Sequence, residues 1–464
     1  MGGTLEIIIG ILLIISFIGL AFYCVKGHNL MIGFLVMAIL WTILPVAGNV
    51  LSGNYDTAKF TTVGAYIINV MQSVFQKGPE GWGQTLVNVL WGAWFGRVML
   101  ETGIAATLIR KTVELGGDRP LITIVLLDIV TTVIFTSMTG AGPVIAIGVI
   151  ILPILFSLGV PKAIAMFTFM GSVAAGIFIN PVNFVQYQTM FDTSNLFPKL
   201  AGSDHVYEWS SYLPFAITAL LVMLVVTIVS TAMAMNKSKT VHAWAAQTAP
   251  AQKKSQNVPG YSLLTPIIPV VLYIGFNFPV IGGFIIAGFF ALFATGRMSN
   301  GFKANCQLIN KMYYDGVVDT APLIGFLLTL PMFNAAAGYA APYFKAIIGG
   351  LIPKSVLLVC IIFAVLAIGG LFRGPLTLVG CGAATLGVMG ALGFSPLILY
   401  PLFAIPTITM NIGSCITQSW VAWGLAYSKV EGKDFLKLSI PNGYIISGVL
   451  SMVVYFFFQS GIIR

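Results

Sequence analysis

The chain has 464 residues, of which 58% are hydrophobic and 8% are charged, and its net charge is +9. Soluble globular proteins have roughly three times that charged fraction, so the composition excludes a soluble fold and predicts an all-α polytopic membrane protein. The basic residues are scattered over short loops, which argues against a nucleic-acid partner. The five cysteines stand singly without CxxC spacing and indicate neither a zinc site nor a disulfide framework. We therefore expect no metal and no cofactor.

Apolar runs near the ~20 residues that cross a bilayer predict membrane helices along the whole chain. The clearest runs cover residues 5–25, 30–50, 121–135, 163–179, 212–234 and 445–458. The first run lacks a basic start and a small-residue cleavage site, so we expect a retained helix and not a signal peptide. The continuous runs do not suit the short alternating segments of an outer-membrane barrel.

Two parts of the chain share their placement of glycine and proline. "ETGIAATLIRKTVELGG" at 101–117 matches "NAAAGYAAPYFKAIIGG" at 334–350, and "AGPVIAIG" from Ala141 matches "RGPLTLVG" from Arg373. Matched residues lie at nearly constant separations, 235 between Gly103 and Gly338 and 232 between Pro143 and Pro375. The sequence thus predicts two structural repeats, at 72–191 and 304–427.

Loop charges indicate that the second repeat is inverted relative to the first. The loop 182–210 is mainly acidic and the loop 236–260 is basic, so the first is expected outside and the second in the cytoplasm. A break at "FNFP" (276–279) divides the run 263–296 into two short helices and gives three crossings between the repeats. Lys345 and Lys354 fall outside in this scheme and count against it. Inverted repeats with paired breaks are typical of secondary transporters.

The complete scheme has about ten spanning helices, one re-entrant hairpin in each repeat and both termini outside. Scaffold helices are expected at 1–71 and at 192–303, and a C-terminal loop and helix at 428–464.

Polar, glycine-rich breaks interrupt each predicted repeat at two places. Irregular backbone at membrane depth persists only inside protein or beside a watery cavity. In the first hairpin, around 136–143, Gly140 and Gly142 allow a turn and Pro143 suits the first position of the next helix, whose unpaired amides would attract an anion. The second hairpin, around 369–376, repeats this arrangement of a helix N-terminus at a Gly-Pro pair and adds Arg373, whose guanidinium can pair bidentately with a carboxylate. A structural bond from Arg373 to hairpin carbonyls is the alternative.

Each repeat also contains a broken helix, at "INPVNFVQYQ" (around 180–188) and at "NIGSCITQSW" (around 411–419). Four polar breaks in two symmetric pairs would converge near the midplane and form a site for a small anion. The predicted substrate-binding residues are Ser137, Thr139, Gly140, Gly142, Asn180, Asn183, Gln186, Arg373, Gly374, Asn411, Ser414, Thr417 and Gln418.

Two acids are candidates for proton coupling. Glu101 lies four residues after Arg97 and could instead form an intrahelical ion pair with it. Asp128 is isolated in an apolar run, where an unpaired carboxyl group favours its protonated form near neutral pH. A shifted helix that brings Asp128 to a partner such as Arg97 is the alternative.

The glycine-rich helix "GRVMLETGIAATLI", the Gly-Pro hairpin tip and the helix broken at Asn-Pro together resemble secondary carriers of the ion transporter superfamily. The first half is most similar to the gluconate permease and citrate-proton symporter families. The resemblance implies a homodimer in a prokaryotic inner (plasma) membrane that carries organic carboxylates with protons or sodium by an elevator-like motion. The tips "SMTGAGP" and "LFRGP" differ from the Ser-Asn-Thr tips of the dicarboxylate-sodium branch.

We therefore expect a transporter that imports a small carboxylate such as citrate, gluconate or a C4-dicarboxylate by cation symport. Protons are the expected coupling ion, because the sodium-type hairpin tips are missing. A sodium-proton antiporter and a sodium-coupled carboxylate symporter are the alternatives; the antiporter would need carboxylates clustered at the breaks. An enzyme is not expected, because paired acids, His with Cys and HExxH are missing from the predicted membrane segments.

Overall fold

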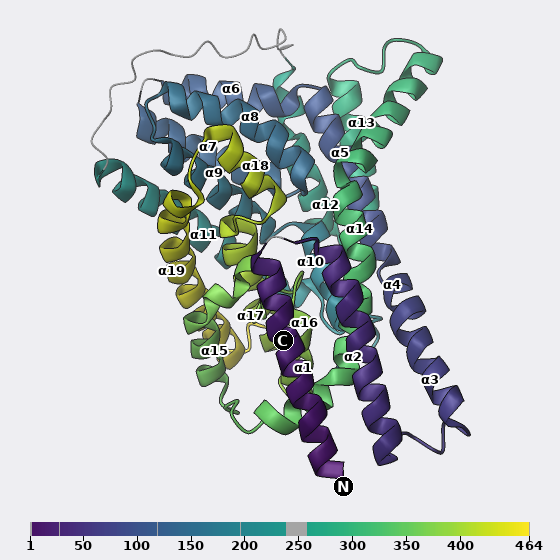
Figure 1. Ribbon diagram of the computed structural model, residues 1–464. Helices are drawn as coiled ribbons and strands as arrows, with labels where there is room; N and C mark the ends of the chain where they lie inside the picture. The colour runs from purple at the N-terminus through teal and green to yellow at the C-terminus, as the bar shows by residue number, and fades with distance from the viewer. Residues whose placement is uncertain (1, 27, 118, 195, 238–257, 464) are drawn as a thin grey trace.

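The computed structural model describes residues 2–26, 28–117, 119–194, 196–237 and 258–463 (Figure 1). Helices make up the regular structure of these residues. The long helices are α1 (Gly2–Val25), α2 (Leu30–Ser52), α5 (Gly83–Glu101), α11 (Trp209–Lys237), α14 (Phe302–Ile348) and α19 (Gly432–Gln459). The shorter helices of the first half are α3 (Val63–Met71), η1 (Gln72–Lys77), α4 (Gly78–Glu80), α6 (Ile104–Gly116), α7 (Pro120–Phe135), α8 (Ala141–Ser157), α9 (Lys162–Ile177) and α10 (Pro181–Thr193). Those of the second half are η2 (Gly260–Ile267), α12 (Ile268–Phe276), α13 (Val280–Ala294), α15 (Val356–Val365), η3 (Ala367–Arg373), α16 (Gly382–Ala391), α17 (Pro396–Pro406), η4 (Thr407–Ile412) and α18 (Ser419–Ser428).

The predicted all-α polytopic membrane fold is confirmed. In the described part of the chain, 5 helices are long and apolar enough to cross a membrane, and two bent pairs raise that number to 7. The expected ten spans are not reached by helix length, because the other apolar helices have only 10–17 residues. Hairpins and broken helices divide the apolar sequence into pieces shorter than a bilayer.

The repeat differs between the two halves at its first element. Gly103 has φ 77° and separates α5 from α6, whereas its sequence counterpart Gly338 lies inside the continuous, 47-residue α14. The glycine match therefore does not mark the same structure in both halves.

The expected breaks between helices occur close to their predicted places. The first hairpin is the turn between α7 and α8, and the first broken helix is the pair α9 and α10, bent by 63°. The second hairpin runs from η3 to α16, and the second broken helix runs from α17 through η4 to α18. Helix α12 ends at Phe276, Asn277 adopts a left-handed conformation, and α13 begins at Val280, so the "FNFP" segment is a break. Most of the predicted basic loop 236–260 lies outside the described residues.

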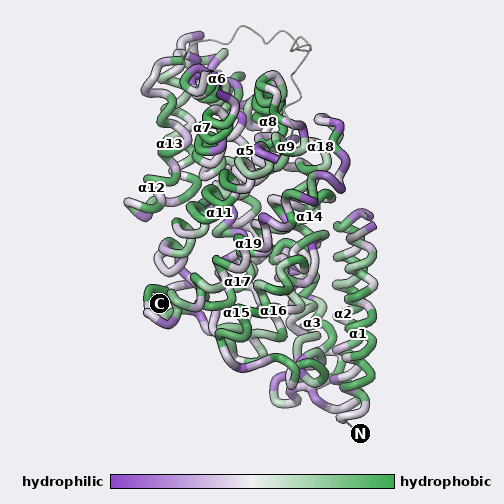
Figure 2. Tube along the Cα trace, turned by 90° about the vertical axis from the view of Figure 1, so that its left-hand side faces the viewer, coloured by the Kyte–Doolittle hydropathy of each residue, from purple (hydrophilic) through white to green (hydrophobic). Residues whose placement is uncertain are grey.

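Four of the long helices, α1, α2, α5 and α14, pack together. Helix α14 packs against α1, α2 and α5, and these helices run lengthwise in Figure 1. Hydrophobic residues cover much of α1 and α2 (Figure 2), as lipid contact requires. Helices α7 and α8 lie at one end and α15 and α16 at the other in both views, so the two hairpins enter from opposite ends.

Candidate functional site

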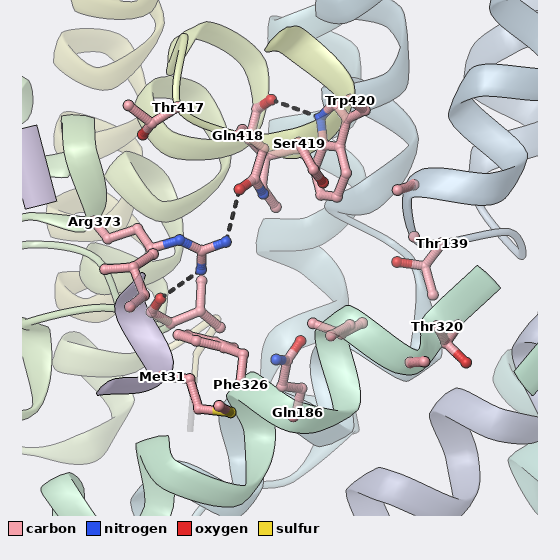
Figure 3. A pocket seen from close by; sticks show the side chains of 18 of the residues that line it. Met31, Thr139, Gln186, Thr320, Phe326, Arg373, Thr417, Gln418, Ser419 and Trp420 are labelled. Atoms are coloured by element: carbon pink, nitrogen blue, oxygen red, sulfur yellow. Dashed lines mark hydrogen bonds between the residues drawn. The ribbon is translucent and has the colours of Figure 1, made fainter. Parts of the chain in front are cut away.

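A cavity of about 540 Å³ lies where the hairpins and the broken helices meet (Figure 3). Its walls come from the first hairpin tip, α10, the middle of α14, the second hairpin, the turn before α18 and the start of α2. Seven of the residues predicted for substrate binding line it: Thr139, Gly140, Asn183, Gln186, Arg373, Thr417 and Gln418. The structure thus brings together residues that lie up to 279 positions apart in the sequence, from Thr139 to Gln418.

The first hairpin presents a helix N-terminus to this cavity. Gly140 precedes α8 with φ 96° and ψ 170°, a backbone region open essentially only to glycine. Gly140 and Ala141 line the cavity, so the unpaired amides of the first turn of α8 lie at its edge. The sequence predicted Pro143 at the first position of this helix. In the structure it is the third residue of α8.

Asn180 holds the first hairpin tip in place and does not line the cavity. Its Nδ2 donates to the carbonyl oxygens of Phe135 and Met138 at 3.0 and 3.1 Å, and its Oδ1 accepts from the amides that open α10. Ser137 Oγ donates to the carbonyl oxygen of Pro266 at 2.7 Å and is also absent from the cavity lining. Both residues were predicted to bind substrate; the structure uses their polar atoms to fix the hairpin instead.

The second hairpin differs from the first in its backbone. Phe372 and Arg373 have φ 54° and 56°, which costs non-glycine residues roughly 1–3 kcal/mol each. Two contacts stabilise this turn, from the Phe372 amide to Cys415 Sγ at 3.2 Å and from the Cys381 amide to the Arg373 carbonyl oxygen at 2.9 Å. Helix α16 begins only at Gly382, so the predicted helix N-terminus at the Gly-Pro pair is wrong. Gly374 is absent from the cavity lining.

The Arg373 side chain bonds to a hairpin carbonyl group, as the alternative prediction had it, and also lines the cavity. Its Nη1 donates to the Val379 carbonyl oxygen at 3.0 Å, a bond within the hairpin, and its Nη2 donates to Gln418 Oε1 at 2.8 Å. The guanidinium lies 4.5 Å from the ring centroid of Phe326, and it faces the cavity in Figure 3. A guanidinium has five N–H donors, so these two bonds leave donors for a ligand.

The second broken helix contributes its last part to the cavity. Thr417 and Gln418 line the cavity just before α18, but Asn411 and Ser414 do not. Ser414 Oγ donates to the Thr409 carbonyl oxygen at 2.9 Å, which explains its position. Asn411 is fully buried, and neither atom of its side-chain amide has a partner among the described residues. It lies in the π-helical segment η4, a geometry often found at functional sites.

An ion pair that the sequence did not predict borders the cavity. Asp319 of α14 lines it and accepts from Arg97 of α5, with Nε to Oδ2 and Nη2 to Oδ1 both at 2.5 Å. The proposed intrahelical pair of Arg97 with Glu101 is therefore wrong. Glu101 is absent from the cavity lining, and its carbonyl oxygen accepts from Arg297 Nη2 at 2.8 Å.

Gly142 lies against this ion pair and is also absent from the cavity lining. A Cβ atom on Gly142 would lie 2.6 Å from Asp319 Oδ2, so the glycine allows α14 and α8 to approach closely.

Asp128 lies apart from the cavity, between α7 and α9. Its carboxylate accepts from Thr168 Oγ1 at 2.6 Å and from Ser172 Oγ at 2.8 Å, and the residue is 3% exposed. Arg97 is occupied by Asp319, so the alternative that paired Asp128 with Arg97 is wrong.

Sequence reasoning missed Asp319 and several other lining residues, among them Asn29, Tyr187, Thr320, Phe326 and Trp420. The sequence held a signal for Asp319. This acid stands inside the largely apolar run 312–348, in which the first basic residue is Lys345. An acid at membrane depth requires a partner, and Arg97 is a base in the same situation.

Comparisons with known proteins find a similar fold among solved structures. No protein-family model matches the sequence, and none of the curated proteins matches it. Among solved structures, the chain is similar to the YdaH transporter of Alcanivorax borkumensis, whose crystal structure is reported to have an unusual topology. The TM-score is 0.64, and the match covers 93% of this chain and 99% of that one at 13% sequence identity.

The fold and the hydrophobic helices define a multi-pass, all-α membrane protein, and its architecture is shared with a solved transporter. At 13% identity, the likeness concerns the fold alone. The resemblance to gluconate permeases and citrate-proton symporters stays an expectation.

Proposed function

We propose that this protein is a secondary active transporter that imports a small organic carboxylate together with a proton. The observation that carries the proposal is the position of Arg373, a cation on the wall of a cavity bounded by both hairpin tips and both broken helices. A charged side chain at membrane depth is costly and marks a substrate or ion pathway by default. The likeness in fold to a solved transporter supports the same class of function.

The cavity suits a small organic anion. Its volume of about 540 Å³ lies within the range of roughly 300–1,000 Å³ of small-molecule sites. Arg373 and Gln418 lie on one side, and Thr139 and Thr320 lie on the other (Figure 3). A carboxylate held by Arg373 would place the rest of the molecule near the Gln186 amide and these hydroxyls, which can bind hydroxyl groups or a second carboxylate. Citrate, gluconate and C4-dicarboxylates fit this description.

A sodium-proton antiporter is less well supported by the same residues. Such a protein needs several carboxylates clustered at the cavity, and Asp319 is the one acid among the described residues that line it. Sodium coupling to carboxylate import is the remaining alternative, and we favour protons because the hairpin tips lack the Ser-Asn-Thr pattern of the sodium branch. Transport as a homodimer in a prokaryotic inner membrane, by elevator-like movement of hairpins and broken helices, completes the proposal.

Uptake into liposomes tests the proposal. Purified protein is reconstituted, a pH gradient or a sodium gradient is imposed in turn, and uptake of labelled citrate, gluconate, lactate and succinate is measured. Arg373→Gln is compared with Arg110→Gln, the same change on the peripheral helix α6, where Arg110 faces Glu114 at 3.8 Å. Charge-assisted hydrogen bonds contribute about 1.5–3 kcal/mol, so Arg373→Gln is expected to weaken anion binding by roughly 10- to 150-fold.

Uptake driven by the pH gradient, lost in Arg373→Gln and kept in Arg110→Gln, would support the carboxylate symporter. Failure of all four anions, together with sodium-dependent proton efflux from the same vesicles, would refute it and favour the antiporter.

A further inference from the structure

The carboxylate of Asp319 lies at a place where an anion is strongly favoured. On one side it accepts two hydrogen bonds from the Arg97 guanidinium, both at 2.5 Å. On the other side it touches the first turn of α8, since a Cβ on Gly142 would lie 2.6 Å from Oδ2 and 2.7 Å from Cγ. A helix N-terminus carries about half a positive charge. Asp319 therefore neutralises two sources of positive potential at the edge of the cavity.

Asp319 is also accessible from the cavity. Its side chain is 16% exposed, and it lines the cavity together with Thr139, Gly140 and Arg373. Asp128, by contrast, is 3% exposed and satisfied by two hydroxyl groups away from the cavity. A group that couples proton binding to anion binding must sense the anion, and in this arrangement Asp319 meets that condition.

We propose that Asp319 is the proton-coupling group of the transporter and that its ionised carboxylate competes with the transported anion for the positive potential of Arg97 and the α8 N-terminus. The proposal rests on the function proposed above and replaces Glu101 and Asp128 in the coupling role. A proton taken from the outside solution binds one carboxylate oxygen and removes its charge. Arg97 and α8 then attract the anion, and both proton and anion are released inside.

The charges around the site make this competition substantial. With Asp319 ionised, Arg97, Asp319 and Arg373 together carry a charge of +1, and with Asp319 protonated they carry +2. Asp315, one turn earlier on α14, and Glu101 on α5 are the further acids that act on Arg97. Because coupling between two ligands is reciprocal, an anion that binds more tightly to the protonated site must also raise the affinity of that site for the proton. Proton symport is the direct consequence.

An equilibrium binding experiment on the full-length protein in detergent tests the inference. Binding of labelled citrate, gluconate, lactate and succinate is measured between pH 5 and 9, and proton uptake on binding is followed with an indicator in weakly buffered solution. Asp319→Asn removes the carboxyl group, and Asp319→Glu restores one. Asp315→Asn is the matched control, because it removes an acid from the same helix, one turn away and outside the cavity lining.

For the wild type and for Asp315→Asn, anion affinity should fall about tenfold per pH unit on the alkaline side, with about one proton taken up per anion bound. Asp319→Asn should bind the anion with an affinity that varies less than about twofold over the same range and should take up no proton. Asp319→Glu should restore the pH dependence. In liposomes, Asp319→Asn should still exchange labelled for unlabelled anion but lose accumulation driven by the pH gradient.

Three results would overturn the inference. Asp319→Asn could retain the wild-type pH dependence, which would place coupling elsewhere while leaving the transporter proposal intact. The double variant Arg97→Gln with Asp319→Asn could restore both stability and proton-driven uptake, which would show a purely structural ion pair. If the wild type binds none of the four anions, the proposed function itself fails, and the coupling role fails with it.

Discussion

Asn180 was predicted to bind substrate, but in the structure its side chain bonds to the first hairpin. Substitution of Asn180 tests whether the position of that hairpin depends on these bonds. The side chain is fully buried and makes four hydrogen bonds. Two go from Nδ2 to the carbonyl oxygens of Phe135 and Met138, and two come to Oδ1 from the amides of Val182 and Asn183. Loss of an N-cap costs about 1 kcal/mol, and each further hydrogen bond about 0.5–1.5 kcal/mol. Asn180→Ala should therefore destabilise the protein by roughly 2–4 kcal/mol.

Unfolding in mixed SDS and detergent micelles measures this loss. Asn180→Asp is the informative second variant, because it keeps the cap acceptor for α10 but removes the two donors to the hairpin. Its expected loss is about 1–3 kcal/mol. Asn183→Ala is the matched control three residues later: Asn183 lines the cavity, and its Oδ1 has no partner among the described residues.

Asn183→Ala should change anion affinity with little effect on stability, the reverse of Asn180→Ala. Equal stability of Asn180→Ala and wild type, combined with weaker anion binding, would refute the assignment of Asn180 as a tether.

Two further predictions concern α7 and α9. Gly176→Ala should destabilise the protein by about 1–3 kcal/mol in the same unfolding assay, because its Cβ would lie 2.4 Å from the Thr132 carbonyl oxygen. The control Gly19→Ala should be neutral, because Gly19 has open space around it. Equal effects of both changes would contradict the close packing at Gly176. Asp128→Asn should leave uptake driven by a pH gradient within about twofold of wild type, because a neutral amide can still accept from Thr168 or Ser172. Loss of proton-driven uptake with intact folding would instead return the coupling role to Asp128.

The sequence predicted where helices break better than what each break does. Glycine and proline restrict the backbone locally, so the turn at Gly140 and the break at Pro181 could be recognised from residue type and spacing. Side-chain partners depend on packing between distant elements. Asn180 and Gln186 are amides on one short segment, yet the first binds hairpin carbonyl groups and the second lines the cavity.

The ion pair of Arg97 and Asp319 shows the same limit more strongly. Its residues are 222 positions apart, and the nearer Glu101 offered a plausible local partner four residues from Arg97. Helical spacing alone cannot decide between a partner on the same helix and one on a neighbouring helix. The decision comes from the packing of α5 against α14.

The cavity wall combines elements that are proposed to move during transport with elements that are proposed to stay in place. Thr139 and Arg373 belong to hairpins, which are proposed to move, whereas Asn29 and Met31 belong to the start of α2, which is proposed to stay as scaffold. Each hairpin is bound to the broken helix of its own half, through Asn180 in the first and through Gln418 in the second. A hairpin can therefore move with its broken helix without losing these bonds. Displacement of such a unit against α2 would change one wall of the cavity while the other remained, which is the physical requirement for alternating access.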